Sequence, residues 1–355
     1  MTKILNASIT KIVILLLLVI TPIQASRGDT LSEFTECLDS CDCSTIPYKY
    51  KIILWSCSSN CNYYCQQLVT NQRTAKGYEM VQFYGKWPFV AIFGIQEFFS
   101  TLFSFGNFIV NYWNFKIIYK QFVINHDDEI KTIYFQYLVL LVVSMIGWIF
   151  SIIFHIKDLS ITETLDYFGA FAIILSNLNV IVVRYFELFR SDKRRVLRIW
   201  QLFLVVTYLF HILKLLNYWD YSYNMKINMV FGVLAMIFWI LHNLKVSKLY
   251  RANEKLLKNS IQLIPFENKL QIKLNSILKI LQINNNLKHK IILNLPIFNN
   301  LILILGIILE INDFEPWFRL IDAHSLWHLL TMIPNLIWYD WNIWDIEILK
   351  ILKKN

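Results

Sequence analysis

Apolar and polar stretches alternate along most of the chain in a pattern typical of membrane helices. Apolar runs recur after residue 88, and a helix of ~20 residues is long enough to cross the ~30 Å hydrocarbon core of a bilayer. Seven segments have a suitable length: 89–112, 134–154, 166–186, 199–217, 226–246, 291–311 and 323–342. The pattern predicts an all-α membrane protein whose seven transmembrane helices form a domain over 89–342.

The composition agrees with a membrane protein. Hydrophobic residues make up 56% of the chain and charged residues 17%, whereas soluble domains have about 50% and about 25%. The net charge of +9 raises the question of a nucleic-acid partner. The basic residues, however, collect in 184–198 and 245–290, between apolar runs, where orientation in the membrane explains them. We therefore expect no nucleic-acid partner.

Residues 1–25 have the features of a secretory signal peptide. Lys3 and Lys11 precede an apolar run over 12–20 that is too short to span a bilayer, and Thr-Pro then ends any helix. A small residue, Ala25, supplies a cleavage position. We expect cleavage after Ala25; an uncleaved anchor is the alternative.

All six cysteines fall between Cys37 and Cys65, shortly after the signal peptide. An even number in a secreted segment predicts a small disulfide-stapled lumenal unit, which we call the cysteine module and place at 26–88. The sequence does not choose among the possible pairings. A metal cluster built on Cys41 and Cys43 is the alternative, and an oxidising compartment disfavours it.

The distribution of Lys and Arg predicts the orientation. The connections 184–198 and 245–290 are rich in basic residues, whereas 155–165, 218–225 and 312–322 contain only Lys157 and Arg319. Basic loops stay in the cytosol, so the N-terminus is expected in the lumen and the C-terminus, with a tail over 343–355, in the cytosol. Residues 251–290 form a cytosolic insertion to which we assign no function.

In this orientation, polar residues from three distant segments converge at the lumenal ends of their helices. Ser151 and His155 end the second span, Asp166 begins the third, and His324 and His328 begin the seventh. Two histidines four residues apart share one helix face and can bind one metal ion. With His155 as a third ligand and water as the fourth, the set predicts a catalytic zinc site beside Ser151 and Asp166.

Other interpretations of these residues remain open. Each histidine alone could serve helix packing, and Ser151, His155 and Asp166 could form a catalytic triad. The triad leaves two histidines unused and lacks a nucleophile-elbow motif. A di-iron centre needs more histidines than the seven of this chain supply. We therefore rank zinc first.

The spacing of these five residues resembles the superfamily of alkaline ceramidases, progestin and adipoQ receptors, and GPI-remodelling factors. Within it, the chain is most similar to the post-GPI attachment to proteins factor 3 family. The similarity lies in the six-cysteine module and in short motifs at 82–89, 96–97, 158–168, 220–225 and 322–328.

The resemblance implies a phospholipase A2-like esterase, a hydrolase of the endoplasmic reticulum or Golgi apparatus that removes the sn-2 unsaturated acyl chain from GPI-anchored proteins. It also implies zinc on His155, His324 and His328, with Ser151 and Asp166 nearby. The GPI substrate rests on the resemblance alone. A ceramidase-like amidase, and a receptor or assembly factor with a structural metal, are the alternatives.

The expected mechanism gives each polar residue a role. Asp166 takes a proton from the attacking water and later returns it, and Ser151 donates a hydrogen bond to the oxyanion. Lys157, Arg319 and the cysteine module are candidates for contact with the glycan or phosphate of the lipid.

Overall fold

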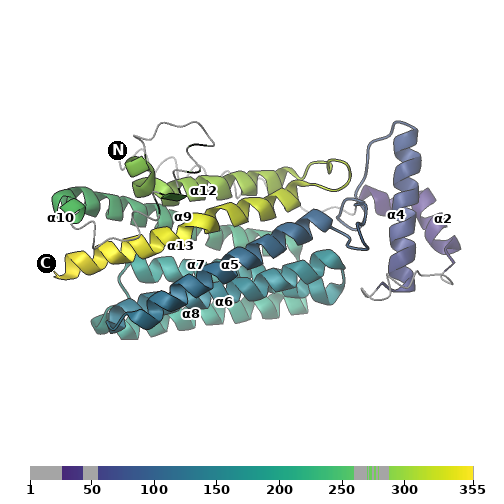
Figure 1. Ribbon diagram of the computed structural model, residues 1–355. Coiled ribbons are helices and arrows are strands. Elements are labelled where there is room, and N and C mark those ends of the chain that lie inside the picture. The colour runs from purple at the N-terminus through teal and green to yellow at the C-terminus, as the bar shows by residue number, and fades with distance from the viewer. Residues whose placement is uncertain are drawn as a thin grey trace, which may run out of the picture.

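The computed structural model describes residues 26–42, 55–259, single positions between 270 and 279, and 288–354. The predicted signal peptide, Cys43 and most of the 251–290 insertion lie outside these residues. Within the described part, seven helices of 24 to 32 residues run side by side as one elongated bundle (Figure 1). They are α5 (Phe98–Ile124), α6 (Asp128–Ile156), α7 (Ser160–Tyr185), α8 (Arg194–Asn217), α9 (Tyr221–Ala252), α12 (Lys288–Asn312) and α13 (Ala323–Lys354).

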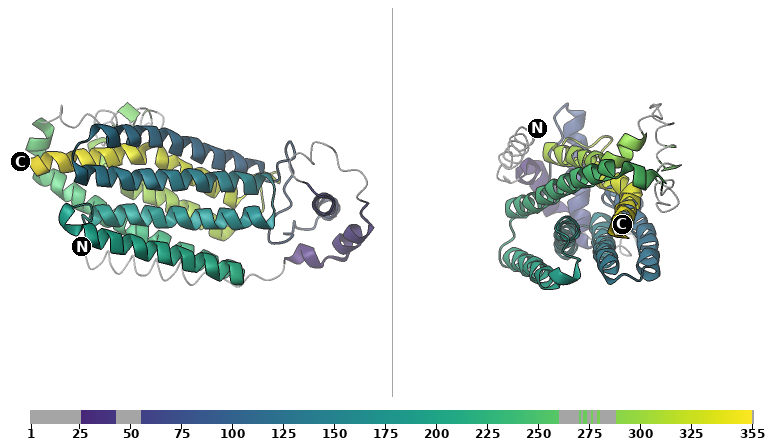
Figure 2. Two further views of the ribbon diagram at one scale, coloured as in Figure 1. Left: turned by 90° about the horizontal axis from the view of Figure 1, so that it is seen from below. Right: turned by 90° about the vertical axis from the view of Figure 1, so that its left-hand side faces the viewer.

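Six of the long helices close into a ring. α5 packs between α6 and α13, α7 packs against α6 and α9, and α12 joins α9 to α13. α8 contacts the outer side of α7, and short α10 (Glu254–Asn259) follows α9 at the far end of the bundle (Figure 2). This arrangement brings the end of α6 and the starts of α7 and α13 to the same end of the bundle.

Among the described residues, α6, α7, α8, α9 and α12 are long and apolar enough to cross a membrane. α5 and α13 are equally long but carry polar side chains, such as Asn107 and Asp345, that are buried inside the bundle. Asn107 donates hydrogen bonds to the His328 carbonyl (2.7 Å) and to Thr331, and so ties α5 to α13. The seven-span count therefore stays a prediction, although seven helices share one bundle.

Most of the long helices extend several residues beyond the predicted spans, and the two outer boundaries differ for identifiable reasons. The first long helix begins at Phe98 rather than at residue 89, because 92–95 forms a tight turn with Phe93 and Gly94 in the left-handed region. The last helix does not end at residue 342 but continues to Lys354. Apolar residues at helical spacing, including Trp344 and Ile348, are buried against the bundle and extend the helix through the predicted tail.

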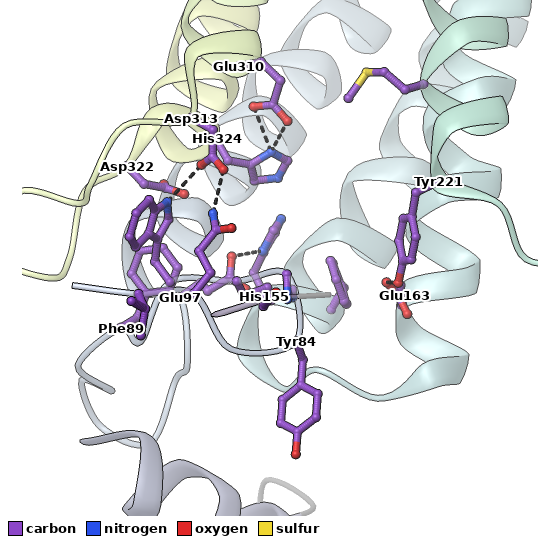
Figure 3. Close-up of a pocket in the computed structure, with 18 of the residues that line it drawn as sticks. Tyr84, Phe89, Glu97, His155, Glu163, Tyr221, Glu310, Asp313, Asp322 and His324 are labelled. Atoms are coloured by element: carbon purple, nitrogen blue, oxygen red, sulfur yellow. Dashed lines mark hydrogen bonds and ion pairs between the residues drawn. The ribbon is translucent and has the colours of Figure 1, made fainter. Parts of the chain in front are cut away.

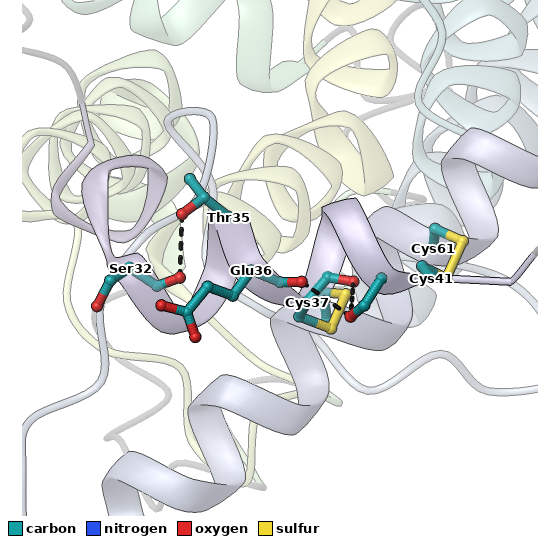
Figure 4. The surroundings of a disulfide bond; sticks show 8 residues. Ser32, Thr35, Glu36, Cys37, Cys41 and Cys61 are labelled. Atoms are coloured by element: carbon teal, nitrogen blue, oxygen red, sulfur yellow. Dashed lines mark hydrogen bonds between the residues drawn. A yellow bond between two sulfur atoms is a disulfide. The ribbon is translucent and has the colours of Figure 1, made fainter.

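The cysteine module lies beyond one end of the bundle. Its helices α2 (Ser32–Ser40) and α4 (Cys57–Ala75) are joined by the disulfides Cys37–Cys65 and Cys41–Cys61 (Figure 4). Cys57 is also disulfide-bonded. The prediction of disulfides near the N-terminus is confirmed, and the module sits at the end of the bundle that carries the histidines (Figure 1).

Arg319 fastens the module to the bundle. From the α12–α13 connection, its guanidinium donates to the Pro88 carbonyl (2.8 and 3.0 Å) and to Asn71 of α4 (2.9 Å), and it also reaches Gln67. Lys157 is buried against the Trp55 ring and donates to Gln96 (3.2 Å). Both cations, candidates for headgroup contact, hold protein segments together.

Candidate metal centre

The three predicted metal ligands meet at one point. His328 Nε2 lies 3.2 Å from His155 Nε2 and 3.0 Å from His324 Nε2. One ring nitrogen of each histidine lies within 4.8 Å of those of the other two. His155 ends α6, and the other two project from the first turns of α13, four residues apart on one face. We call these three residues the metal centre.

Carboxylates fix the orientation of two of the imidazoles. His155 Nδ1 lies 2.7 Å from Glu97 Oε2, and His324 Nδ1 lies 2.9 and 3.1 Å from the two oxygens of Glu310 (Figure 3). An ionised carboxylate only accepts, so each Nδ1 carries a proton, and in the neutral imidazole that a metal ion binds each Nε2 presents a lone pair. Metal-binding histidines have this carboxylate–histidine arrangement.

The donor set fits a zinc ion. Nε2 of His155 and of His324 both direct lone pairs at His328 Nε2, which can donate one proton at most, so at least one of these lone pairs has no proton to accept. A shared cation would satisfy that lone pair. Three neutral imidazole nitrogens are the ligands of catalytic zinc sites.

Asp166 and Ser151 lie beside the metal centre at different depths. Asp166, nearly two turns into α7, is close enough to interact with Ser151, His155 and His324, and its side chain faces the neighbouring cavity. Ser151 is buried one turn below His155, 3.1 Å from Ser104 Oγ of α5, and is not among the residues that line the cavity. The five predicted residues are therefore in one place, but only some face open space.

A cavity of about 1000 Å³ opens above the metal centre. It lies between the module loop, the start of α9 and the end of α12, and Figure 3 shows several of its acidic side chains. The Tyr221 hydroxyl donates to Glu163 on one wall (2.6 Å), and Asp313 accepts from Gln82 (2.6 Å) and Trp87 on the other. The cavity gives a substrate access to His155, His324 and Asp166.

Lys86 supplies a positive charge at the edge of this cavity. Its Nζ lies 3.0 Å from Glu97 Oε1 and 2.9 Å from Asp158 Oδ2. Burial alone would lower the pKa of Lys86, but the two carboxylates outweigh it and raise that pKa above its usual value. Lys86 thus stays charged next to the carboxylate that holds His155.

Comparison with known proteins places the chain in a family. Residues 47–346 match the Per1-like family. The chain belongs to the Per1-like family. It is 31% identical to Protein PER1 of Saccharomyces cerevisiae, with 91% of this chain and 93% of the relative covered. It is 27% identical to Post-GPI attachment to proteins factor 3 of Drosophila melanogaster, with 94% of each chain covered.

A third relative carries an enzymatic name. The Per1-like chain is 27% identical to the GPI-specific phospholipase A2-like PGAP3 of Xenopus tropicalis, with 90% of each chain covered. No solved structure matches this chain. The predicted likeness to the post-GPI attachment factors is confirmed, whereas the wider link to ceramidases and adipoQ receptors stays a resemblance.

The sequence-based prediction missed several residues of this Per1-like site. Glu310 is the one charged residue in the apolar run 291–311, which is itself a signal of function. Glu97 and Lys86 belong to the short family motifs at 96–97 and 82–89, which do not by themselves indicate a contact with a metal ligand. Ser104 gave no signal, since serine is common at helix contacts.

Proposed function

We propose that this protein is a metal-dependent, phospholipase A2-like hydrolase that removes the sn-2 acyl chain from the lipid of GPI-anchored proteins. One observation carries the hydrolase assignment: three Nε2 atoms converge beside a cavity, and two of the imidazoles are oriented by Glu97 and Glu310. The names of the Per1-like relatives supply the substrate.

The residues at the cavity have distinct roles in ester hydrolysis. His155, His324 and His328 would hold a zinc ion, which would supply a Lewis acid for the ester carbonyl and an activated water as nucleophile. Asp166 faces the cavity beside His155 and His324, where it can take the proton of the attacking water. It returns this proton to the departing sn-2 oxygen, so the products are a free fatty acid and a lysolipid.

Ser151 takes a different part from the one its spacing predicted. Its hydroxyl lies beside Asp166 and Ser104, below the cavity wall. From there it can orient the Asp166 carboxylate, and we assign it this part in place of the predicted hydrogen bond to the oxyanion. The chain therefore supplies one proton-transfer group, Asp166, and a serine that supports it.

The arrangement of the molecule supports a lumenal reaction. Disulfides form in oxidising compartments, and the disulfide-bonded module sits at the same end of the bundle as the metal centre. We propose that this end faces the lumen of the endoplasmic reticulum or Golgi apparatus and that the C-terminus faces the cytosol. The lipid of the lumenal leaflet then reaches the cavity directly.

The first test is release of fatty acid from a GPI-anchored protein by the purified chain in lipid nanodiscs, followed by mass spectrometry. His324→Ala and His155→Ala are each expected to reduce release to background, because each removes one of three ligands. His126→Ala, a histidine on an exposed loop, is the matched control and should retain full activity.

Three outcomes would contradict the proposal. Full activity of either ligand variant would exclude the metal centre as the catalytic site. Hydrolysis of ceramide without hydrolysis of GPI lipid would favour an amidase. Stoichiometric zinc without turnover of either lipid would favour a receptor or assembly factor with a structural metal.

A further inference from the structure

A tight turn of the cysteine module reaches into the bundle beside the metal centre. Phe83 and Lys86 exchange backbone hydrogen bonds of 2.8 and 2.9 Å, and the two residues at the tip, Tyr84 and Gly85, have φ values of 50° and 77°. Such left-handed tips belong to the compact turns that reverse the chain within two residues. The turn fixes where the Lys86 side chain leaves the backbone.

Lys86 is connected to His155 through a single carboxylate. Glu97 Oε1 lies 3.0 Å from Lys86 Nζ, and Glu97 Oε2 lies 2.7 Å from His155 Nδ1. Asp158 Oδ2 holds the same Nζ at 2.9 Å, and the Phe154 ring centre lies 4.0 Å from it. With one oxygen held by Lys86, the other oxygen of Glu97 faces His155.

The N-terminal end of the module holds this turn in place. Gly28 N donates to the Gln82 carbonyl (3.0 Å), Asp29 accepts from Tyr84 N (2.8 Å), and Ser26 Oγ accepts from Gly85 N (2.7 Å). A Cβ on Gly28 would lie 2.4 Å from the Gln82 carbonyl oxygen and 2.6 Å from the Phe83 ring, so the close approach requires glycine.

The same turn is anchored in the core of the module. Phe83 packs with Phe34, Cys65 and Val69, and Cys65 is disulfide-bonded to Cys37 of α2. A continuous set of contacts therefore runs from the disulfides through the turn and Lys86 to Glu97 and His155.

We propose that Lys86 is a positioning residue of the metal centre, and that the cysteine module completes this centre by holding the turn that carries Lys86. The proposal rests on the metal centre of the proposed function. It gives the module a task in assembling the site itself. A module that served only to bind the headgroup would not need a cation shared with the carboxylate of a metal ligand.

The test compares zinc affinity, measured by competition with a chelator on the full-length purified protein, for Lys86→Met and the wild type. Loss of a group that orients a metal ligand typically weakens metal binding about 10- to 100-fold, and this is the expected result. Lys86→Arg, which can still bridge two carboxylates, should restore most of the affinity.

Lys157→Met is the matched control. Lys157 lies two residues from His155 and is buried, but it donates to Gln96 and packs on Trp55, so it touches no carboxylate that holds a metal ligand. The zinc affinity of the Lys157→Met protein should equal that of the wild type. Unchanged zinc affinity in Lys86→Met would overturn the proposal, and a raised KM alone would assign Lys86 to the substrate headgroup.

A second pair of variants tests the role of the module. Gly28→Ala must displace the turn, whereas Gly232→Ala on α9 meets nothing within 4 Å. Gly28→Ala should weaken zinc binding several-fold with its disulfides intact, and Gly232→Ala should not. Equal zinc affinity in both would refute the part given to the module. A wild type that binds no zinc would instead contradict the proposed function.

Discussion

At the scale of single residues, the metal centre depends on which nitrogen of each imidazole carries its proton. Glu97 and Glu310 bind the Nδ1 atoms of His155 and His324 and leave the Nε2 atoms to converge on His328. The two acids come from opposite sides, Glu97 from the start of α5 and Glu310 from the end of α12. The ring orientations therefore depend on four helices.

Glu310→Ala tests this dependence. Without the carboxylate, the His324 ring can rotate and its Nε2 loses its direction, so zinc affinity should fall about 10- to 100-fold. Chelator competition measures the change. Glu315→Ala, an exposed acid in the adjoining loop, is the control and should bind zinc like the wild type. A Glu310→Ala protein with wild-type affinity would show that the carboxylate does not position His324.

At the scale of elements, close contact between α6 and α7 sets the distance from His155 to Asp166. The Gly147 Cα lies 3.0 Å from the position that a Cβ on Gly169 would occupy, so the two backbones touch where both residues are glycine. Gly169 lies one turn from Asp166 along α7. The absence of two side chains thus brings Asp166, the proposed proton-transfer group, next to His155.

Gly169→Leu should push α7 away from α6. A large side chain placed in a tight contact costs about 1–3 kcal/mol, and Asp166 would move with its helix. We expect a lower unfolding temperature and a kcat reduced at least ~10-fold, since misplaced catalytic groups lose rate steeply. Zinc affinity should change little, because none of the three ligands lies on α7. Gly232→Leu, on an open face of α9, should behave like the wild type.

A buried ion pair ties three helices together in the half of the bundle far from the metal centre. Arg184 of α7 donates to both oxygens of Asp345 on α13 (2.7 and 3.0 Å), and His242 of α9 lies 3.0 Å from the same carboxylate. Arg184 is 5% exposed and Asp345 1%. Charged groups inside a bundle are costly unless paired, so this cluster specifies how α7, α9 and α13 meet.

Asp345→Ala should lower the free energy of unfolding by about 3–5 kcal/mol, because it leaves the Arg184 guanidinium buried without its partner. Denaturant titration in detergent measures the change. Lys353→Ala breaks the exposed pairs of Lys353 with Asp127 and Glu129 and should cost no more than about 1 kcal/mol. A similar loss of unfolding free energy in the two variants would contradict the proposal that the buried cluster specifies how the three helices meet.

At the scale of the whole molecule, the sequence predicts the long helices well, because the length and hydrophobicity of each apolar run indicate a helix without knowledge of the rest of the fold. The site was predicted in part because the bias of Lys and Arg assigns each helix end to one side of the membrane, and this brings His155 next to His324 and His328. The first helix begins later, and the last helix ends later, than the predicted spans, because the turn before Phe98 and the buried far end of α13 depend on tertiary packing.

The contacts that complete the site could not be predicted in the same way. Glu97 and Glu310 lie 58 and 14 residues from the histidines that they bind, and no periodicity links the members of such pairs. The position of Lys86 depends on how the module docks on the bundle, which Arg319 and Asp313 control through bonds spanning more than 200 residues. Contacts between residues so far apart in the sequence become visible only in the folded structure.

The most direct test of the central claim is the lipid profile of GPI anchors in cells whose only copy of this protein carries His324→Ala. The account predicts that unsaturated sn-2 chains persist on the anchors, as in cells that lack the protein, whereas wild type and His126→Ala replace them. Anchors of wild-type composition in His324→Ala cells would contradict metal-dependent deacylation by this site.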